Sequence, residues 1–398
     1  MSQAYNLLCG AVPAADQRPL PPFAPDALAF LAELSALLLK DKEAKAYPDV
    51  VTFAFFCRKA NLDKLRQAYD GQTADRLGRG VCFHIAPSNV PINFAYSLTA
   101  ALLAGNASVV KASSKRFVQT EMVCRAMNAL LAGEHAALAP YVCVVTYPRE
   151  AQEWTEHFSA VCDARVIWGG DETVRRVREA PLSPRAFDVT FADRVSLLCL
   201  RAQAIRDMEE AALAKLAQGF YNDTFLTDQN ACTAPRLVCW EGDGESVRAA
   251  KERFWSAVHA YAAPRYPIEP VIAVDKLTAA CETALTLPET RLVWGKDNLI
   301  LRVQTETLEP GLETCRSPGG FFLEYEGDSL AALAPVINPK VQSLSYAGFA
   351  PEELRAWILD NGLRGIDRVV PVGHTLDFSL TWDGVDLIRT LSRRVVAI

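Results

Sequence analysis

One cysteine of this chain stands in a setting that suits a nucleophile. Cys232 lies in DQNACTAPR, residues 228–236, among small and polar neighbours rather than in an apolar run. Small neighbours leave room for a substrate to approach the sulfur, and a thiolate is a strong nucleophile once its pKa is lowered. The segment therefore favours nucleophilic catalysis, with an inert buried cysteine in a loop as the alternative.

A side-chain amide that can stabilise an oxyanion follows an apolar strand pattern. Asn89 lies in APSNVPINF, residues 86–94, between two prolines. Pro91 restricts the residue before it to extended backbone, which predicts a rigid strand-to-helix turn. Because α/β sheets bind ligands at the carboxyl ends of parallel strands, an amide held here can face a cleft. The alternative is that Asn89 caps a helix that starts near Ile92.

Cations and hydroxyls follow the next strand pattern, NASVVKASS. Lys111 ends the strand, and the residues after it include Ser113, Ser114, Lys115 and Arg116. Such a set can hold a ribose or a ribose phosphate. A solvated loop that opens a helix is the alternative.

Two glycines, Gly169 and Gly170, follow a further strand pattern in WGGDE, residues 168–172. Without a Cβ atom they let a phosphate approach the backbone at the start of a helix. The chain has no G-x-G-x-x-G, the ordinary fingerprint of dinucleotide binding. The glycine pair taken by itself is therefore weak support for a cofactor site.

The elements that must position these residues alternate between strand and helix patterns from residue 76 onward, as in parallel βαβ units. Helices are expected to stop near Gly105 and Gly133, and Asp26 is expected to cap the first helix of the chain. A second α/β unit begins with DMEEAALAKLAQGFYN. The first unit is predicted to be doubly wound and to contain the strand patterns GVCFHI, ASVVKAS, YVCVV, ARVIW and FDVTFADRVSLLCL.

Composition argues against several classes of function. The 398 residues carry a formal net charge of −6, and the sequence pI is near 5.6, which argues against nucleic-acid or anionic-membrane binding. The sequence shows neither a signal-peptide pattern nor an apolar stretch that could span a bilayer, so we expect a soluble cytoplasmic protein. The eleven cysteines form no C-x-x-C pair or Cys/His cluster, so we expect reduced thiols and no metal site.

Taken in order, these motifs resemble those of one superfamily. PSNVP is similar to the Pro-Trp-Asn-Phe-Pro turn of aldehyde dehydrogenases, LLAGNASVVKAS to their Ala-Gly-Asn…Lys-Pro-Ser strand, IWGGDETV to their Gly-Ser turn and DQNACTAPR to their Gly-Gln-x-Cys loop. Within the superfamily, FHIAPSNVP, WGGDE and GIDRVVPVGHTLDFSLTWDG resemble the LuxC-type acyl-CoA reductases. The likeness runs from about residue 76 to the C-terminus.

The resemblance implies an α/β, aldehyde-dehydrogenase-like fold with two doubly wound, Rossmann-like domains and a cleft between them. We expect an N-terminal arm and helices in residues 1–75, a nicotinamide-cofactor-binding domain in 76–200 and a catalytic domain that carries the cysteine in 201–364. Residues 365–398 are expected to close the cleft and are a candidate oligomer contact. A homodimer or homotetramer is expected, because the superfamily commonly pairs subunits.

The resemblance also implies catalytic roles. Cys232 would attack an acyl thioester and hold the acyl group as a new thioester. The side-chain amide of Asn89 and the backbone N–H of Cys232 would stabilise the tetrahedral oxyanion. His374, in PVGHTLDF, is a candidate proton donor, with a structural role as the alternative.

For the cofactor, the resemblance implies that Lys111 binds the adenosine ribose and that Gly169 and Gly170 lie against the cofactor. Ser113 and Ser114 join the cofactor-binding set. NADPH carries a 2′-phosphate, which the cations and hydroxyls after Lys111 suit, so NADPH is favoured, with NADH as the alternative.

Departures from the superfamily pattern sharpen the expected reaction. DVTFADR stands where aldehyde oxidisers carry Glu-Leu-Gly-Gly, and Thr190 occupies the place of the glutamate that activates water. Without that base, the acyl-enzyme should persist for reduction or for exchange with a thiol. Gln229 stands one position further from the cysteine than in the superfamily, which leaves its role open. Glu324, in FFLEYEG, is only a loose match to the Glu-x-Phe motif that holds the nicotinamide ribose.

The leading hypothesis is an NAD(P)H-dependent reductase that converts a long-chain acyl-CoA or acyl-protein thioester to the aldehyde, together with an acyl-transferring partner subunit. One alternative is a short-chain CoA-acylating aldehyde dehydrogenase. The other is a non-catalytic scaffold or acyl-carrying subunit, against which Cys232 and Asn89 count, because a scaffold needs neither.

Overall fold

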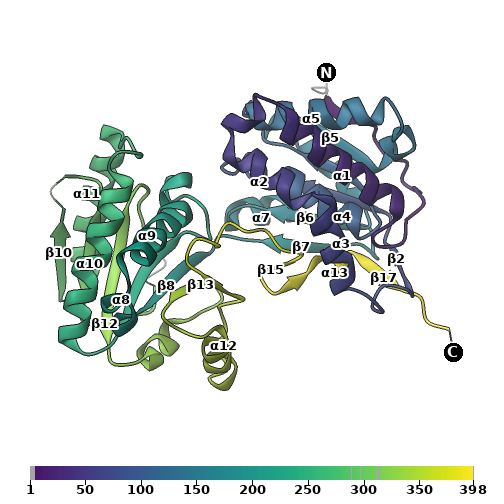
Figure 1. Ribbon diagram of the computed structural model, residues 1–398. Coiled ribbons are helices and arrows are strands. Elements are labelled where there is room, and N and C mark those ends of the chain that lie inside the picture. The colour runs from purple at the N-terminus through teal and green to yellow at the C-terminus, as the bar shows by residue number, and fades with distance from the viewer. Residues whose placement is uncertain (1–4, 288, 296, 312–313, 398) are drawn as a thin grey trace. The chain divides into compact units, whose positions relative to one another are not determined.

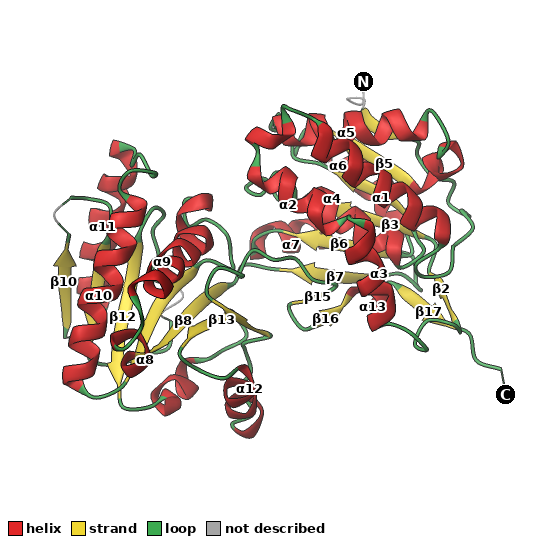
Figure 2. Ribbon diagram, in the orientation of Figure 1, coloured by secondary structure: helices red, strands yellow, loops and turns green. Residues whose placement is uncertain are grey.

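The computed structural model describes residues 5–287, 289–295, 297–311 and 314–397, and the chain forms two compact units. The first unit comprises residues 1–192 together with 378–398, and the second comprises residues 193–377. Each unit is built on its own sheet with helices on both faces (Figures 1 and 2).

The sheet of the first unit is doubly wound, in the order β1-β5-β4-β3-β6-β7. All neighbouring strands are parallel except β1, which pairs antiparallel with β5. The interior strands are continuous apolar runs because helices cover both of their faces. The strands are β1 (Asn6–Gly10), β3 (Val81–Ile85), β4 (Ala107–Lys111), β5 (Val142–Thr146), β6 (Ala164–Trp168) and β7 (Phe187–Phe191).

The helices of this unit divide between the two faces of the sheet. Buried side chains of α1, α4 and α5 pack on one face, and those of α6 and α7 pack on the other. Gly105 has a positive φ of 91° just after α4, as expected of a glycine that ends a helix. The helices are α1 (Pro25–Lys40), α2 (Pro48–Phe56), α3 (Lys59–Ala68), α4 (Asn93–Leu103), α5 (Val118–Leu131), α6 (Gln152–Val161) and α7 (Asp171–Arg178).

The start of α1 corrects one prediction. The N-cap residue is Ala24, without a side-chain cap, and Asp26 lies inside the first turn. Pro25 takes the first helical position, where its missing N–H is no loss and its fixed φ suits the helix. The carboxylate of Asp26 still stabilises the positive end of the helix dipole.

The C-terminal residues return to the first unit. β17 (Ser392–Arg394) pairs antiparallel with β2 (Arg76–Gly78), and the side-chain amide of Asn106 donates to the carbonyl of Leu391 at 2.8 Å. In the described residues of the tail, helix α13 (Leu387–Thr390) follows the short strands β15 (Thr381–Trp382) and β16 (Val385–Asp386).

The second unit has a seven-stranded sheet in the order β10-β11-β12-β9-β8-β13-β14, parallel except for β10. β8 belongs to this sheet, between β9 and β13, although the sequence placed it in the first unit. The strands are β8 (Val195–Arg201), β9 (Pro235–Glu241), β10 (Thr290–Trp294), β11 (Leu301–Thr305), β12 (Phe321–Gly327), β13 (Val341–Ala347) and β14 (Arg368–Pro371).

The helices of the second unit also cover both faces of the sheet. An aromatic-rich core lies between the sheet and α9 and α10, and a second core lies between the sheet and α11 and α12. The helices are α8 (Ala202–Arg206), α9 (Glu210–Thr224), α10 (Gly244–Ala262), α11 (Pro270–Thr286) and α12 (Pro351–Asp360).

Candidate functional site

The cysteine segment is a tight turn between α9 and β9. The thiol of Cys232 is exposed, whereas its neighbours Ala231 and Thr233 are buried. Two consecutive residues before it, Asp228 and Gln229, have left-handed backbone conformations, with φ of 49° and 58°. Such conformations are strained for residues other than glycine and persist only where the surroundings hold them.

Gln229 is the main brace of this turn. Its buried side chain donates to the carbonyls of Pro235 and Phe321 at 3.0 and 2.9 Å. Its amide oxygen accepts from the backbone N–H groups of Gly320 and Phe321 at 2.9 and 3.1 Å. All four hydrogen-bonding positions of the amide are therefore satisfied. The role that the sequence left open is structural, because Gln229 fastens the cysteine segment to the start of β12.

Further contacts hold the same turn from other elements. The hydroxyl of Ser196 on β8 donates to the carbonyl of Cys232 at 2.8 Å, and the hydroxyl of Tyr266 donates to the carboxylate of Asp228 at 2.8 Å. The guanidinium of Arg236 donates to the carbonyl of Gln229. An exposed sulfur thus stands on a backbone that buried groups fix in place.

Nine of the eleven cysteines are buried, including Cys82, Cys143 and Cys199, and no disulfide forms among the described residues. This confirms that these three are buried small hydrophobes. Cys281 is the second exposed cysteine, and it lies within helix α11.

Asn89 lies in the first unit, in the turn between β3 and α4, and it is exposed. The N-cap residue of α4 is Ile92 rather than Asn89, and the Ile92 side chain makes no capping hydrogen bond. β3 lies between β4 and β6, where the winding of the sheet reverses, and such a switch point is where α/β sheets bind ligands.

The cofactor-binding candidates of the first unit meet at this same edge. Ile85 of β3 is in register with Lys111 of β4 and with Ile167 of β6. The ends of these three strands therefore bring Lys111, the turn that holds Asn89, and Gly169 to neighbouring positions.

Lys111 lies in a positive environment. Its ammonium is 5.0 Å from the centre of the Tyr147 ring. Burial, followed by the charges of Arg149 and Arg176, lowers its pKa below the ordinary lysine value. The sequence did not identify these two arginines, because they follow β5 and lie on α7, far from Lys111 along the chain.

The hydroxyls after Lys111 are used partly within their own turn. The side-chain oxygen of Ser113 accepts from the backbone N–H of Lys115 at 3.1 Å, and Ser114 is exposed. The guanidinium of Arg116 donates to Glu121 at 2.7 and 3.0 Å. The charges that lower the pKa of Lys111 are thus those of Arg149 and Arg176, and Arg116 is paired with Glu121.

The glycine pair lies where the sequence placed it, between β6 and α7. Gly170 is the N-cap residue of α7, and a Cβ atom added there would meet nothing within 4 Å. Gly169 has less room, since its Cβ atom would come within 2.9 Å of the Thr173 side chain. Asp171 and Glu172 occupy the first turn of α7 and add negative charge there.

Three other candidates have clear surroundings. His374 is exposed in the second unit, and its Nδ1 lies 2.8 Å from the carboxylate of Asp377. Thr190 lies near the end of β7, in register with Ile167. His84 is buried, contacts Ser97 at 2.8 Å, and has its pKa lowered to about 3 by burial, so it is a neutral core histidine.

Glu324 does not offer a ribose-binding carboxylate. It is buried on β12, and its oxygens accept from the indoles of Trp240 and Trp255 at 2.9 and 2.7 Å and from the amide of Gln304 at 2.8 Å. The loose motif match therefore reflects a structural carboxylate.

The fold is that of aldehyde dehydrogenases. A benzaldehyde dehydrogenase from Corynebacterium glutamicum superposes with a TM-score of 0.63 and 16% identity, covering 96% of this chain and 85% of that one. A 1-pyrroline-5-carboxylate dehydrogenase from Thermus thermophilus superposes with a TM-score of 0.64 and 16% identity, covering 98% and 93%.

The family model for acyl-CoA reductase (LuxC) matches residues 49–394. The chain belongs to the LuxC acyl-CoA reductase family. Membership places it among the oxidoreductases that act on acyl or aldehyde groups, and the family uses a nicotinamide cofactor. The match begins well before residue 76, where the likeness by motif begins.

A long-chain acyl-protein thioester reductase from Aliivibrio fischeri is 27% identical over 168 residues, which is 42% of this chain and 33% of that relative's length. The matched segment thus spans about a third of that relative. Within the described part of the LuxC chain, no helix is long and apolar enough to cross a membrane. The described residues also include no cluster of three or more His, Cys, Asp or Glu that could hold a metal ion.

Proposed function

We propose that this LuxC-family chain reduces a long-chain acyl-CoA or acyl-protein thioester to the aldehyde through an acyl group carried on Cys232. The observation that carries the proposal is the exposed thiol of Cys232 on a turn that the buried Gln229 and Ser196 side chains hold in place. An inert cysteine has no need of such a setting. The Aliivibrio fischeri relative, a long-chain acyl-protein thioester reductase, supports the same substrate class.

The first half of the reaction is a thioester exchange. The thiolate of Cys232 attacks the acyl carbonyl carbon, its new C–S bond forms, and the bond to the donor's sulfur breaks, so the donor leaves as a thiol after taking up a proton. In the second half, the acyl carbon on Cys232 would accept the hydride that a bound reduced nicotinamide supplies. The bond to Cys232 then breaks, and the aldehyde leaves.

Asn89 is proposed to donate its side-chain N–H to the oxyanion of both tetrahedral intermediates. The support is its place after β3, at the switch point of the sheet, and its exposure. This assignment requires the Asn89 turn and the Cys232 turn, which belong to different units, to meet around the substrate during catalysis.

Thr190 is proposed to stand where a water-activating glutamate would speed hydrolysis of the acyl-enzyme. A threonine hydroxyl is a poor general base near pH 7 because it is not basic enough to take a proton from water. The acyl group on Cys232 is therefore expected to survive long enough to be reduced.

The residues at the switch point fit a nicotinamide cofactor. Lys111 offers a half-buried cation, and Gly170 leaves open space at the start of α7. Arg149 and Arg176 add positive potential around Lys111, which would suit the 2′-phosphate of NADPH. We therefore propose NADPH as the preferred form, with Ser113 and Ser114 at the ribose end. His374 is kept as a candidate proton donor.

Intact-protein mass spectrometry after exposure to acyl-CoAs of graded length tests the proposal. One added acyl group is expected, mapped by peptide analysis to Cys232 and not to Cys281, and most extensive with long chains. Adding NADPH should then remove the adduct and release the aldehyde. Acylation only by short chains would favour a short-chain CoA-acylating dehydrogenase, and no acylation would favour a scaffold.

A further inference from the structure

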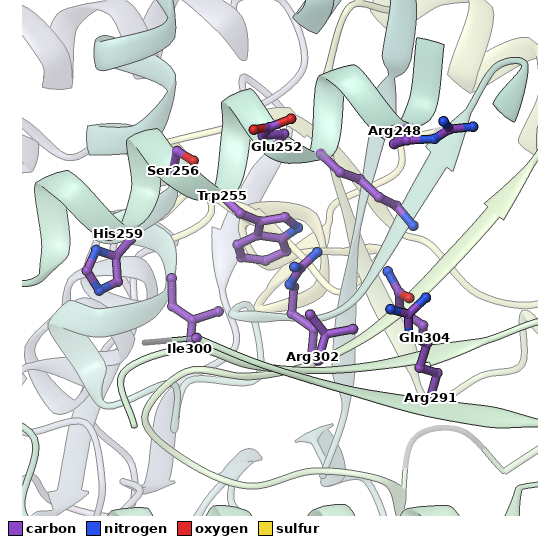
Figure 3. A pocket seen from close by; sticks show the side chains of 12 residues that line it. Arg248, Glu252, Trp255, Ser256, His259, Arg291, Ile300, Arg302 and Gln304 are labelled. Carbon is purple, nitrogen blue, oxygen red and sulfur yellow. The ribbon is translucent and has the colours of Figure 1, made fainter. Parts of the chain in front are cut away.

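A cavity lined by several charged side chains lies in the second unit, between α10 and the edge strands β10 and β11 (Figure 3). Its volume is about 660 Å³, within the range of small-molecule sites. No residue of the Cys232 turn lines it. The lining side chains come from α10 on one side and from the β10–β11 hairpin on the other, and they include Arg248, Lys251, Trp255, Arg291, Arg302 and Gln304.

The inner wall is organised by the buried carboxylate of Glu324. Beside the two indoles and Gln304, it accepts from the guanidinium of Arg302 at 3.1 Å and lies 3.6 Å from the ammonium of Lys251. Burial alone would raise the pKa of Glu324, but Lys251 and Arg302, with the hydrogen bonds of Gln304 and Trp255, hold it below the ordinary value. The carboxylate therefore stays charged and fixes both cations at the wall.

The fixed cations keep donors for a ligand. The hydrogen bonds of Arg302 to Glu324 use one terminal nitrogen, and a guanidinium carries five N–H donors in all. Lys251 also pairs with the exposed Glu326 at 2.8 Å, so part of its charge is neutralised. The positive and negative charges of the inner wall thus nearly cancel. Any net positive charge in the cavity must come from other side chains.

The rim supplies that excess. Arg248 and Arg291 are exposed and line the cavity. Their guanidinium groups form no hydrogen bond or ion pair with any other described residue. Glu252 also lines the cavity, and its carboxylate forms no hydrogen bond or ion pair with another described residue. Its negative charge offsets part of the positive charge of the two arginines. Two free guanidinium groups against one free carboxylate leave a positive field at this end of the cavity.

The opposite end is less charged. In Figure 3, Arg248, Arg291 and Gln304 lie toward one end, Arg302 lies near the middle beside Trp255, and Ser256, His259 and Ile300 lie toward the other end. The distance between the ends follows from α10, where the eleven residue steps from position 248 to 259 rise about 16 Å. A ligand with an anionic head and an organic body would match this polarity.

We propose that this cavity binds a small organic molecule through a phosphate or diphosphate group, with Arg248 and Arg291 as the principal contacts and Arg302 as the inner one. Guanidinium forks suit phosphate oxygens because they donate two parallel charged hydrogen bonds. This site is separate from acyl transfer at Cys232 and stands without the proposed function. A free phosphate compound and a phosphate within a nucleotide share this chemistry.

Isothermal titration calorimetry with inorganic pyrophosphate and with ADP, on the full chain in moderate salt, tests the site. Saturable one-to-one binding is expected. Arg291→Ala and Arg248→Ala should each weaken it about tenfold or more. Glu252→Gln should strengthen it several-fold, because it removes the opposing charge. Tighter binding of ADP than of pyrophosphate would show that the organic part of the ligand also contributes to affinity.

Arg355→Ala on α12 is the matched control, since the Arg355 side chain is likewise exposed, forms no hydrogen bond or ion pair with another described residue, and does not line the cavity. The affinity of the Arg355→Ala variant for pyrophosphate and ADP should equal that of the unchanged chain. All these variants change surface side chains, and thermal unfolding checks that each is folded. Absence of saturable binding, or equal effects of Arg355→Ala and Arg291→Ala, would overturn the proposal.

Discussion

The two exposed cysteines show that exposure alone does not make a nucleophile. Cys281 lies in the middle of α11, where the carbonyl four residues earlier takes up the backbone N–H. Cys232 lies on a turn with left-handed residues before it, held by Gln229, Ser196 and Tyr266. A helix residue needs no such bracing. The difference indicates that hydrogen bonds from other elements fix the position of the Cys232 sulfur, whereas the Cys281 sulfur is placed by its helix alone.

Replacing each cysteine in turn gives the largest expected contrast. Cys232→Ala should reduce aldehyde formation by about 10⁴-fold or more and abolish acylation, because no other group can carry the acyl intermediate. Cys281→Ala should leave both unchanged within about twofold. Steady-state oxidation of NADPH and mass spectrometry of the acyl adduct measure the two effects. Retained acylation in Cys232→Ala would show that another residue is the nucleophile.

Asn89→Ala asks whether the braced cysteine works with a donor from the other unit. Loss of one oxyanion donor lowers kcat by about 10²–10³-fold, while the acyl donor should still bind. Asn89→Asp should be at least as damaging, since a carboxylate repels the oxyanion. Thermal unfolding should change little, because Asn89 is exposed and is not the N-cap residue of α4. An unchanged kcat would exclude Asn89 from the reaction.

Gln229→Ala tests the brace itself. The variant would leave the carbonyls of Pro235 and Phe321 and the N–H groups of Gly320 and Phe321 without their hydrogen-bond partner. Each unsatisfied buried group costs about 1–3 kcal/mol. We expect an overall loss of several kcal/mol in the free energy of unfolding, measured by urea denaturation. Acylation should slow while Cys281 keeps its reactivity toward a thiol reagent. Unchanged stability would show that the turn is held by other contacts.

Much of this arrangement could be predicted from the sequence, and the missed parts have identifiable reasons. Lys111, Gly169 and the Asn89 turn were found because each directly follows an apolar strand pattern, and carboxyl ends of parallel strands meet at one edge. The placement of β8 was missed, because an apolar strand pattern does not state which sheet it joins.

Contacts between distant segments left no local signal. The bond network of Gln229 depends on Gly320 and Phe321, about ninety positions away, and no motif marks them. The same holds for Arg149 and Arg176 around Lys111, and for Glu324, whose motif resemblance suggested a ribose contact where the structure has buried indole and amide partners.

The smallest expected effect concerns another buried brace of the second unit. Asp223, on the same helix that leads to the Cys232 turn, accepts from the backbone N–H groups of Gly373 and Thr375 at 2.6 and 3.0 Å and so fastens the segment that carries His374. Burial raises its pKa to about 6, against the lowering effect of these hydrogen bonds. Unlike the neutral amide of Gln229, this brace changes charge within the working pH range.

The sign of the pH effect follows from that raised value. The folded protein holds the proton on Asp223 more tightly than the unfolded chain, so this group favours folding at low pH and loses that contribution as the pH rises through about 6. A shift of about two pKa units corresponds to about 2–3 kcal/mol at most. Urea denaturation of Asp223→Asn, compared with the unchanged chain between pH 5 and 7.5, should show a flatter dependence of the unfolding free energy on pH. The Gln229→Ala variant should keep the original slope, because Gln229 does not titrate. Equal slopes for the unchanged chain and Asp223→Asn would show that Asp223 does not titrate between pH 5 and 7.5.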